Sequence, residues 1–205
     1  IISIYTDPEM QGSKIQLFVK RPALPEQMNN LIYGEMFDVI QAYMTTMENA
    51  RLQEISMKPD APFLGAGMGS GEIGVIPTLN ATTFVAMTQD GKLAEGFEAI
   101  YTEMEKVRRY GFTQGEFERA QNDLMRRAER NDRRNGEFVQ TYLNNYSKNT
   151  PMPDAETEWQ LDSMLIKMIN VEAVNGFAQQ VIYPRNQVIV VTAPEKEGIV
   201  NPTAE

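Results

Sequence analysis

A run of glycines is the first feature that could do chemistry, because Gly69 to Gly74 (GSGEIG) matches the G-x-G-x-x-G pattern of dinucleotide-binding loops. In such loops a helix follows the pattern directly, so that the pyrophosphate lies at the helix N-terminus. Here Pro77, Asn80 and a β-branched segment follow instead, and the glycines continue upstream to Gly65 and Gly67. Alternate glycines leave one strand face bare, which lets a helix or another backbone approach closely. We therefore predict a packing role for this run and no nucleotide site.

A group of arginines on one predicted helix is the second candidate, since it could bind an anionic substrate. These arginines are Arg119, Arg126, Arg127, Arg130, Arg133 and Arg134. The acidic residues interleaved with them are Glu116, Glu118, Asp123, Glu129 and Asp132. Opposite charges three or four residues apart on a helix form ion pairs. The pattern therefore favours a solvated helix face over an anion site, and a salt-bridge role between domains is compatible with either interpretation.

Glu35 and Asp38 share one face of a predicted helix and could act as an acid–base pair or as metal ligands. Two carboxylates are too few for a complete metal site. We expect them to be solvated at the surface or to make a contact like that of a helix cap. Carboxylate-only magnesium or calcium sites remain chemically possible, although no other pattern in the sequence indicates one.

The strongest signal is the absence of residue types that most catalytic sites need: the 205 residues include no histidine and no cysteine. Imidazole and thiolate are the usual protein ligands of zinc. Imidazole is also required for Ser–His–Asp catalysis, and imidazole together with thiolate for Cys–His catalysis. We predict no catalytic, cofactor-binding or metal-binding residue, and no hydrolytic activity of this chain alone. Such a sequence is more typical of a scaffold or a fragment than of a complete enzyme.

Charge and hydropathy restrict the partners. The net charge of −9 disfavours binding to nucleic acid or to an anionic membrane. No apolar run approaches the roughly 20 residues that span a bilayer. The chain starts Ile1-Ile2-Ser3-Ile4, without the features of a signal peptide, and we expect it to be a piece of a longer polypeptide.

Hydrophobic periodicity and turn residues predict the secondary structure. The expected strands are 2–6, 14–20, a glycine-rich strand 63–76, 82–87 and 187–192, with Pro77 to Asn80 separating the third from the fourth. The expected helices are 25–55, 93–110, 114–142 (either continuous or interrupted at Asn135-Gly136), 154–168 and 171–181. Thr113 and Glu116 form a capping box, and Asn170 caps the last helix. Strands followed mainly by helices predict an α+β fold, in which helices pack on one face of a mostly antiparallel sheet. We expect a single domain over residues 1–194 and a linker or tail over residues 195–205.

Several segments, taken in order, resemble the domains of the insulinase-like (pitrilysin, M16) family of zinc metallopeptidases. They are Thr6 to Gln11 (TDPEMQ), Met47 to Glu54 (MENARLQE), Ala61 to Phe63 followed by the glycine-rich strand, Gly111 to Ala120 (GFTQGEFERA), and Ile182 to Val188 (IYPRNQV). The resemblance implies the α+β metallohydrolase-like fold of that family. It also implies a larger protein, in which several homologous domains enclose a chamber around unfolded peptides.

Active copies in this family carry an inverted zinc motif, His-x-x-Glu-His, on an early helix, and a further glutamate ligand downstream. The corresponding region here, Glu26 to Asp38 (EQMNNLIYGEMFD), offers no imidazole. The resemblance therefore implies an inactive copy with no cofactor of its own, and zinc is expected in the catalytic domain of the parent protein.

The resemblance implies a structural function in proteolysis. We expect a non-catalytic domain that follows a homologous catalytic domain in the same polypeptide, packs on it and helps to form the peptide-binding chamber. Its partners would be that domain and the peptide substrates of the parent, which the resemblance suggests is periplasmic or in the cell envelope. The alternative is a stand-alone non-catalytic partner or structural subunit of an M16-type complex. A carboxylate-based or nucleotide-dependent enzyme is a third possibility.

Overall fold

The computed structural model describes residues 1–29, 32–73, 76–129, 135–148, 150–198 and 201–203. Five strands of this part of the chain form one sheet, in the spatial order β1-β5-β2-β4-β3. The strands are β1 (Ile2–Asp7), β2 (Ser13–Pro22), β3 (Gly65–Ile73), β4 (Ile76–Thr88) and β5 (Gln187–Pro194). The helices are α1 (Glu26–Asn29), α2 (Ile32–Ser56), α3 (Leu93–Tyr110), α4 (Gln114–Glu129), α5 (Asn135–Lys148), α6 (Ala155–Met168) and α7 (Val171–Val181).

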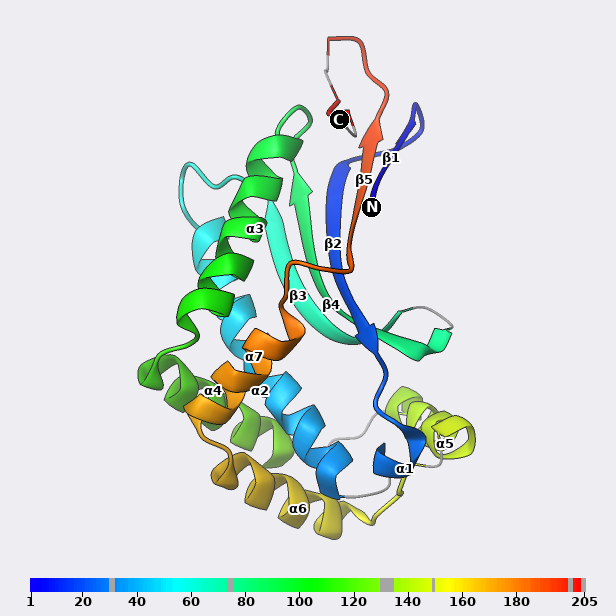
Figure 1. The fold of residues 1–205 in the computed structure, drawn as a ribbon, viewed down its shortest axis with the longest axis vertical. Helices are drawn as coiled ribbons and strands as arrows, with labels where there is room; N and C mark the ends of the chain where they lie inside the picture. Colours follow the sequence, from blue (N-terminus) through cyan, green and yellow to red (C-terminus); the bar gives the residue numbers. More distant parts are fainter. Residues whose placement is uncertain (30–31, 74–75, 130–134, 149, 199–200, 204–205) are drawn as a thin grey trace.

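The sheet is mostly antiparallel. β2 pairs antiparallel with β4 on one side and with β5 on the other, and β3 pairs antiparallel with β4 as the edge strand. The β1–β5 pair is parallel and brings the first and last strands together, as Figure 1 shows near the label N. The predicted α+β fold with a mostly antiparallel sheet is confirmed.

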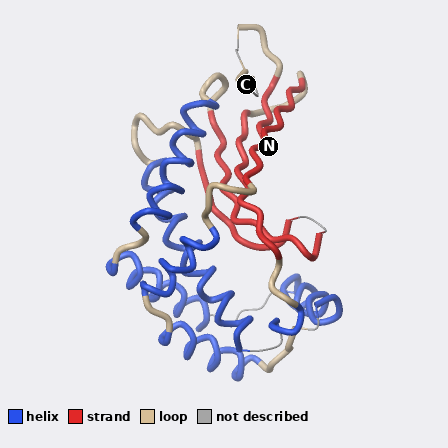
Figure 2. The backbone as a smooth tube through the Cα atoms, viewed as in Figure 1, coloured by secondary structure: helices blue, strands red, loops and turns tan. Residues whose placement is uncertain are grey.

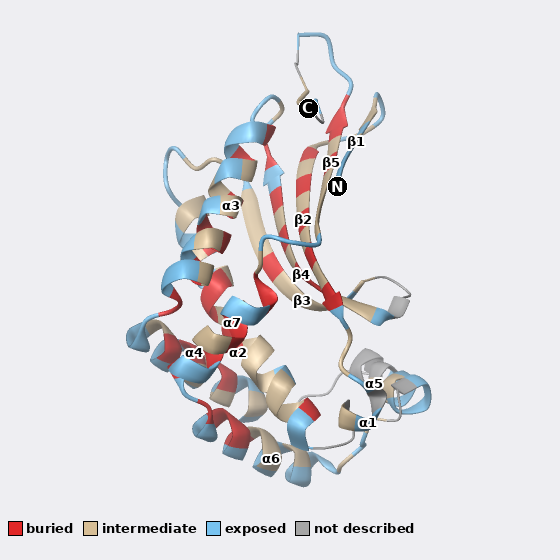
Figure 3. Cartoon of the chain, viewed as in Figure 1, coloured by how far each residue is buried: buried red, intermediate tan, exposed pale blue. Residues whose placement is uncertain are grey.

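The core lies between the sheet and the helices that cover one of its faces (Figure 2). In β2 the side chains alternate, and Ile15, Leu17 and Val19 are fully buried on the face toward the helices. The long helix α2 packs against β3, and α3 and α7 pack beside it. The buried side of α2 therefore contacts both the sheet and the neighbouring helices. Figure 3 shows the buried residues gathered along this contact. Helices α2 and α3 pack on the strands, α7 packs against these two helices, and α4 and α6 pack against α2.

One predicted element boundary differs from the structure, and two further predictions fall partly on undescribed residues. Pro77 to Asn80 does not separate two strands but belongs to β4, because the antiparallel ladder with β2 continues to the pair Pro22–Leu79. The predicted helix 25–55 is observed as α1 and α2, with residues 30–31 outside the described part. The choice between a continuous and an interrupted helix 114–142 falls on residues 130–134, which also lie outside the described part.

Candidate functional site

The glycine-rich segment forms β3, and the next described element is the antiparallel strand β4 rather than a helix. This is not the geometry of a dinucleotide-binding loop. Close approach is observed at Gly67, where a Cβ atom would lie 3.4 Å from Asn49 Oδ1 of α2, but Gly65 and Gly69 face open space. The packing prediction is therefore correct at Gly67 and wrong at Gly65, Gly69 and Gly71, since no atom lies within 4 Å of a Cβ atom at these three positions. Gly74 lies outside the described residues.

Asn49 explains why a helix approaches the edge strand at this point. Its side-chain oxygen accepts a hydrogen bond from Met68 N at 2.7 Å, and its amide nitrogen donates to Met68 O at 3.0 Å. One α2 side chain thus bonds both backbone groups of Met68 in the way that a neighbouring strand would. The contact fixes α2 against the sheet.

The arginine-rich helix behaves as a solvated face where it is described. Arg127 pairs with Asp123 four residues earlier at 2.5 Å, and Arg126 donates to the backbone oxygen of Asn122 at 3.2 Å. Arg119 is exposed. The ion-paired interpretation is therefore supported for this part of α4. The remaining members, Arg130, Asp132, Arg133 and Arg134, lie outside the described residues.

Glu35 and Asp38 do lie on one side of α2, near its first turn. Glu35 is half-buried, and burial together with the charges of Asp38 and Asp162 raises its pKa. Asp38 is exposed and accepts a hydrogen bond from Gln41 Nε2 at 3.0 Å. These contacts agree with the expected surface role of Asp38, whereas Glu35 is less exposed than predicted.

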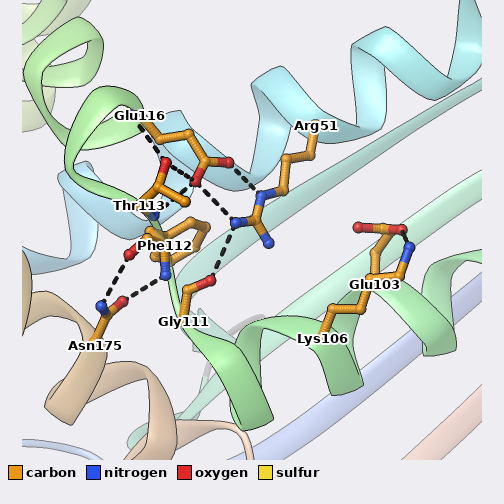
Figure 4. A network of polar contacts seen from close by, with 8 residues as sticks. All are labelled: Arg51, Glu103, Lys106, Gly111, Phe112, Thr113, Glu116 and Asn175. Carbon is orange, nitrogen blue, oxygen red and sulfur yellow. Dashed lines mark hydrogen bonds and ion pairs between the residues drawn. The ribbon is translucent and has the colours of Figure 1, made fainter.

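A charged cluster that the sequence analysis did not identify lies between α2, α3 and α4. It consists of Glu48, Arg51, Glu103, Lys106 and Glu116, and Figure 4 shows all of these except Glu48. Glu48 is 1% exposed, and among the described residues neither of its carboxylate oxygens has a hydrogen-bond partner. Burial raises the pKa of Glu48 to about 8, the charge of Arg51 opposes this rise, and Glu103 and Glu116 add to it. Glu48 is therefore mostly protonated at neutral pH.

Arg51 joins α2 to the start of α4. It binds Glu116 through two bonds, Nε to Oε1 at 2.5 Å and Nη2 to Oε2 at 2.9 Å, and it also donates to Gly111 O at 3.0 Å. Its guanidinium carbon lies 4.8 Å from the centre of the Phe112 ring. Such paired charge-assisted hydrogen bonds are among the stronger polar contacts in proteins.

The predicted capping box at the start of α4 is confirmed. Glu116 accepts hydrogen bonds from the backbone N of Thr113 at 2.7 Å and from its hydroxyl at 2.8 Å, and Glu116 N donates to that hydroxyl at 3.4 Å. Burial alone would raise the pKa of Glu116, but the bonds from Arg51 and Thr113 outweigh it and lower the pKa to about 2. Glu116 is thus ionised over the working pH range of most proteins.

Asn175 of α7 holds the same turn from the other side. Its side chain accepts from Phe112 N at 2.7 Å and donates to Phe112 O at 3.0 Å. Gly111 has φ = 70°, and a Cβ atom there would lie 2.5 Å from Asn175 Cγ. Only glycine fits this position without strain. The turn between α3 and α4 is therefore fixed by two long-range polar contacts, one from α2 and one from α7.

The cluster forms a charged joint between α2 and α4. Its carboxylates Glu103 and Glu116 are paired with Lys106 and Arg51, respectively. Within the described ranges, no group of three or more His, Cys, Asp or Glu residues is placed to hold a metal ion. Nor does any described helix combine the length and the apolar character that crossing a bilayer requires.

No protein-family model matches the sequence, and no curated protein is similar to it in sequence. Solved structures are similar in fold. The periplasmic protease PqqL of Escherichia coli superposes with a TM-score of 0.79 at 18% identity, over 93% of this chain and 21% of PqqL. The inactive domain of an M16 peptidase from Pseudomonas fluorescens gives a TM-score of 0.65 at 14% identity, over 95% of this chain and 43% of that one. The chain has the fold of an M16 peptidase domain.

The chain thus spans only part of the first of these proteins. It covers more of a protein from Bordetella pertussis Tohama I that is described as a zinc protease, with 93% of that chain matched, a TM-score of 0.59 and 12% identity. The resemblance to the M16 or insulinase family is therefore confirmed for the fold.

Proposed function

We propose that this chain is a non-catalytic domain of an M16-family zinc metallopeptidase. Residues 1–194 would form the domain and residues 195–205 a linker or tail. The domain would pack on a homologous catalytic domain of the same polypeptide and help to form the chamber that binds peptides. The observation that carries the proposal is an M16-type fold made from a sequence without a single imidazole or thiolate.

The zinc ion that the fold family implies does not fit the residues present. The described residues of the early region that resembles the zinc-binding helix of active copies lie in α1 and the first turns of α2. Next to these turns a buried cation, Arg21, lies between the sheet and α2 and donates hydrogen bonds to Gln41, Ser70 and Thr82. Its guanidinium carbon is 6.0 Å from the centre of the Phe37 ring. A fixed positive charge at this place would repel a divalent cation.

The charged joint supports a scaffold role. Arg51, Glu116 and Asn175 tie α2, α4 and α7 together through contacts far apart in the sequence, which favours one rigid shape over a mobile catalytic loop. A rigid wall is what a domain needs if it is to support an adjacent catalytic domain. The alternative, a stand-alone non-catalytic partner or structural subunit, requires the same rigidity. An upstream His-x-x-Glu-His in the same reading frame would favour the first role.

The test is reconstitution of peptidase activity. The purified chain is assayed on an unstructured fluorogenic peptide alone, and then the parent protein is assayed with and without this segment. We expect no hydrolysis above background by the chain, chelator-sensitive hydrolysis by the parent, and loss of most activity when the segment is deleted. Hydrolysis by the chain after further purification, or full activity of the deletion variant, would contradict the proposal.

A further inference from the structure

The carboxyl group of Glu48 is the member of the charged cluster that stabilises no contact. Its side chain is 1% exposed, and neither oxygen has a hydrogen-bond partner among the described residues. Moving an ionised carboxylate into such surroundings costs far more free energy than moving the neutral carboxyl group. The burial and the missing partners therefore favour a proton on Glu48 in the folded chain.

The charge balance of the cluster leads to the same conclusion. The charged groups that act on Glu48 come from three helices: Arg51 of α2, Glu103 and Lys106 of α3, and Glu116 of α4. Arg51 pairs with Glu116 and Lys106 pairs with Glu103, so these four charges cancel. The cluster is therefore neutral while Glu48 is protonated, and it carries one net negative charge once Glu48 is ionised.

Arg51 is the cation that is placed to respond to this extra charge. It follows Glu48 by three residues on α2, a spacing that puts the two side chains on one helix face. Its guanidinium holds the turn between α3 and α4 through bonds to Glu116 and to Gly111 O. Away from water the attraction between opposite charges is several times stronger than in water. Any movement of Arg51 toward an ionised Glu48 lengthens the bonds that hold the turn.

We propose that Glu48 and Arg51 form a pH-sensitive latch on the turn between α3 and α4. With Glu48 protonated, Arg51 fastens the turn to α2; with Glu48 ionised, Arg51 is drawn toward Glu48 and the turn loosens. The buried ring of Phe112, which lies against the guanidinium, loosens with it. The latch is a property of this chain that goes beyond the proposed scaffold role and does not depend on it.

A spin label on the turn tests the latch. Because the sequence has no cysteine, a single introduced cysteine can be labelled selectively with an iodoacetamide nitroxide. The label is placed at Gln114→Cys, an exposed position at the start of α4. Its mobility is measured by electron paramagnetic resonance from pH 6 to pH 10. We expect the mobile fraction to rise in one step centred near pH 8, since burial raises the pKa of Glu48 to about that value.

A control label and three variants locate the step. A label at Ala94→Cys, at the opposite end of α3, should show no step. Glu48→Gln should abolish the step at the turn. Glu103→Gln should move the midpoint to lower pH and Lys106→Gln to higher pH, because the charge of Glu103 raises the pKa of Glu48 and that of Lys106 lowers it. These last two variants break the same ion pair, so loss of the pair by itself would move both midpoints in one direction.

Each outcome decides the proposal, and circular dichroism at each pH verifies that the chain is folded. Absence of a step, a step that persists in Glu48→Gln, or an equal step at the Ala94 label would overturn the latch. Midpoint shifts of the same sign in Glu103→Gln and Lys106→Gln would also overturn it, even if Glu48→Gln failed to fold. None of these results bears on the scaffold role, which is tested by the activity of the parent with and without the segment.

Discussion

Glu48 gives the most quantitative prediction, because a carboxyl group that is protonated when folded must become ionised when the chain unfolds. Its pKa is about 8 in the folded chain, against the ordinary value of 4.5. Between these two pH values the folded state binds more protons than the unfolded state, so the free energy of unfolding falls as the pH rises. The contribution is fully present below about pH 4.5 and is lost as the pH rises through about 8.

The size of the effect follows from the same two values. Each pH unit between 4.5 and about 8 is worth about 1.4 kcal/mol, so Glu48 removes about 3–5 kcal/mol of stability between pH 5 and pH 9. The substitution Glu48→Gln keeps the shape and removes the ionisable group. Its stability relative to the unmodified chain should therefore rise by that amount across this range.

Urea unfolding at constant ionic strength, measured at intervals from pH 5 to pH 9, tests this prediction. The sequence has no histidine or cysteine, so no side chain of these types titrates between pH 5 and pH 9 and adds to the pH dependence of stability. Glu54→Gln, an exposed position on the same helix, is the control and should show no such trend. The reasoning is refuted if the difference between Glu48→Gln and the unmodified chain is independent of pH, or if Glu54→Gln reproduces it.

Two further substitutions test the joint between the helices. Arg51→Met should lower the free energy of unfolding by about 2–4 kcal/mol, because it leaves Glu116 half-buried without its cation. A double-mutant cycle with Glu116→Gln should give a coupling energy above 1 kcal/mol, which is roughly the most that exposed ion pairs give. Additive effects of the two substitutions would argue against the ion pair. Gly111→Ala should lower the free energy of unfolding, measured by heat or urea, by about 3 kcal/mol, since φ is positive there and the new methyl group would clash with Asn175. The control Gly115→Ala, in the first turn of α4, should be neutral or raise the free energy of unfolding by about 0.5–1 kcal/mol. Equal effects of the two alanines would show that the turn is not constrained.

Features fixed by local sequence could be predicted. The alternation of Ile15, Leu17 and Val19 predicted the strand β2 and its buried face. The spacing of Thr113 and Glu116 predicted the capping box, which the structure confirms. Both depend on residues within a few positions of each other, so periodicity and capping chemistry suffice. The absence of imidazole was also evident from composition alone.

Features fixed by distant neighbours could not be predicted. Strand β4 includes Pro77 because it pairs with β2 up to Leu79 and with β3 at Ile76, and no local pattern contains these pairings. The contacts of Asn49 with Met68 and of Asn175 with Phe112 join positions 19 and 63 residues apart. The position of Glu48 in the sequence, between the apolar residues Met47 and Leu52 of a predicted helix, was a hint that it could be buried. A single carboxylate among apolar helix residues does not by itself reveal whether it faces the core.

The chain has an M16-type fold but no imidazole or thiolate, so we expect it not to bind the zinc ion of active M16 peptidases. Isothermal titration of the metal-free chain with zinc at pH 7, followed by metal analysis after dialysis, tests this claim most directly. We predict no saturable binding and far less than one zinc ion per chain. One tightly held zinc ion per chain would contradict the account.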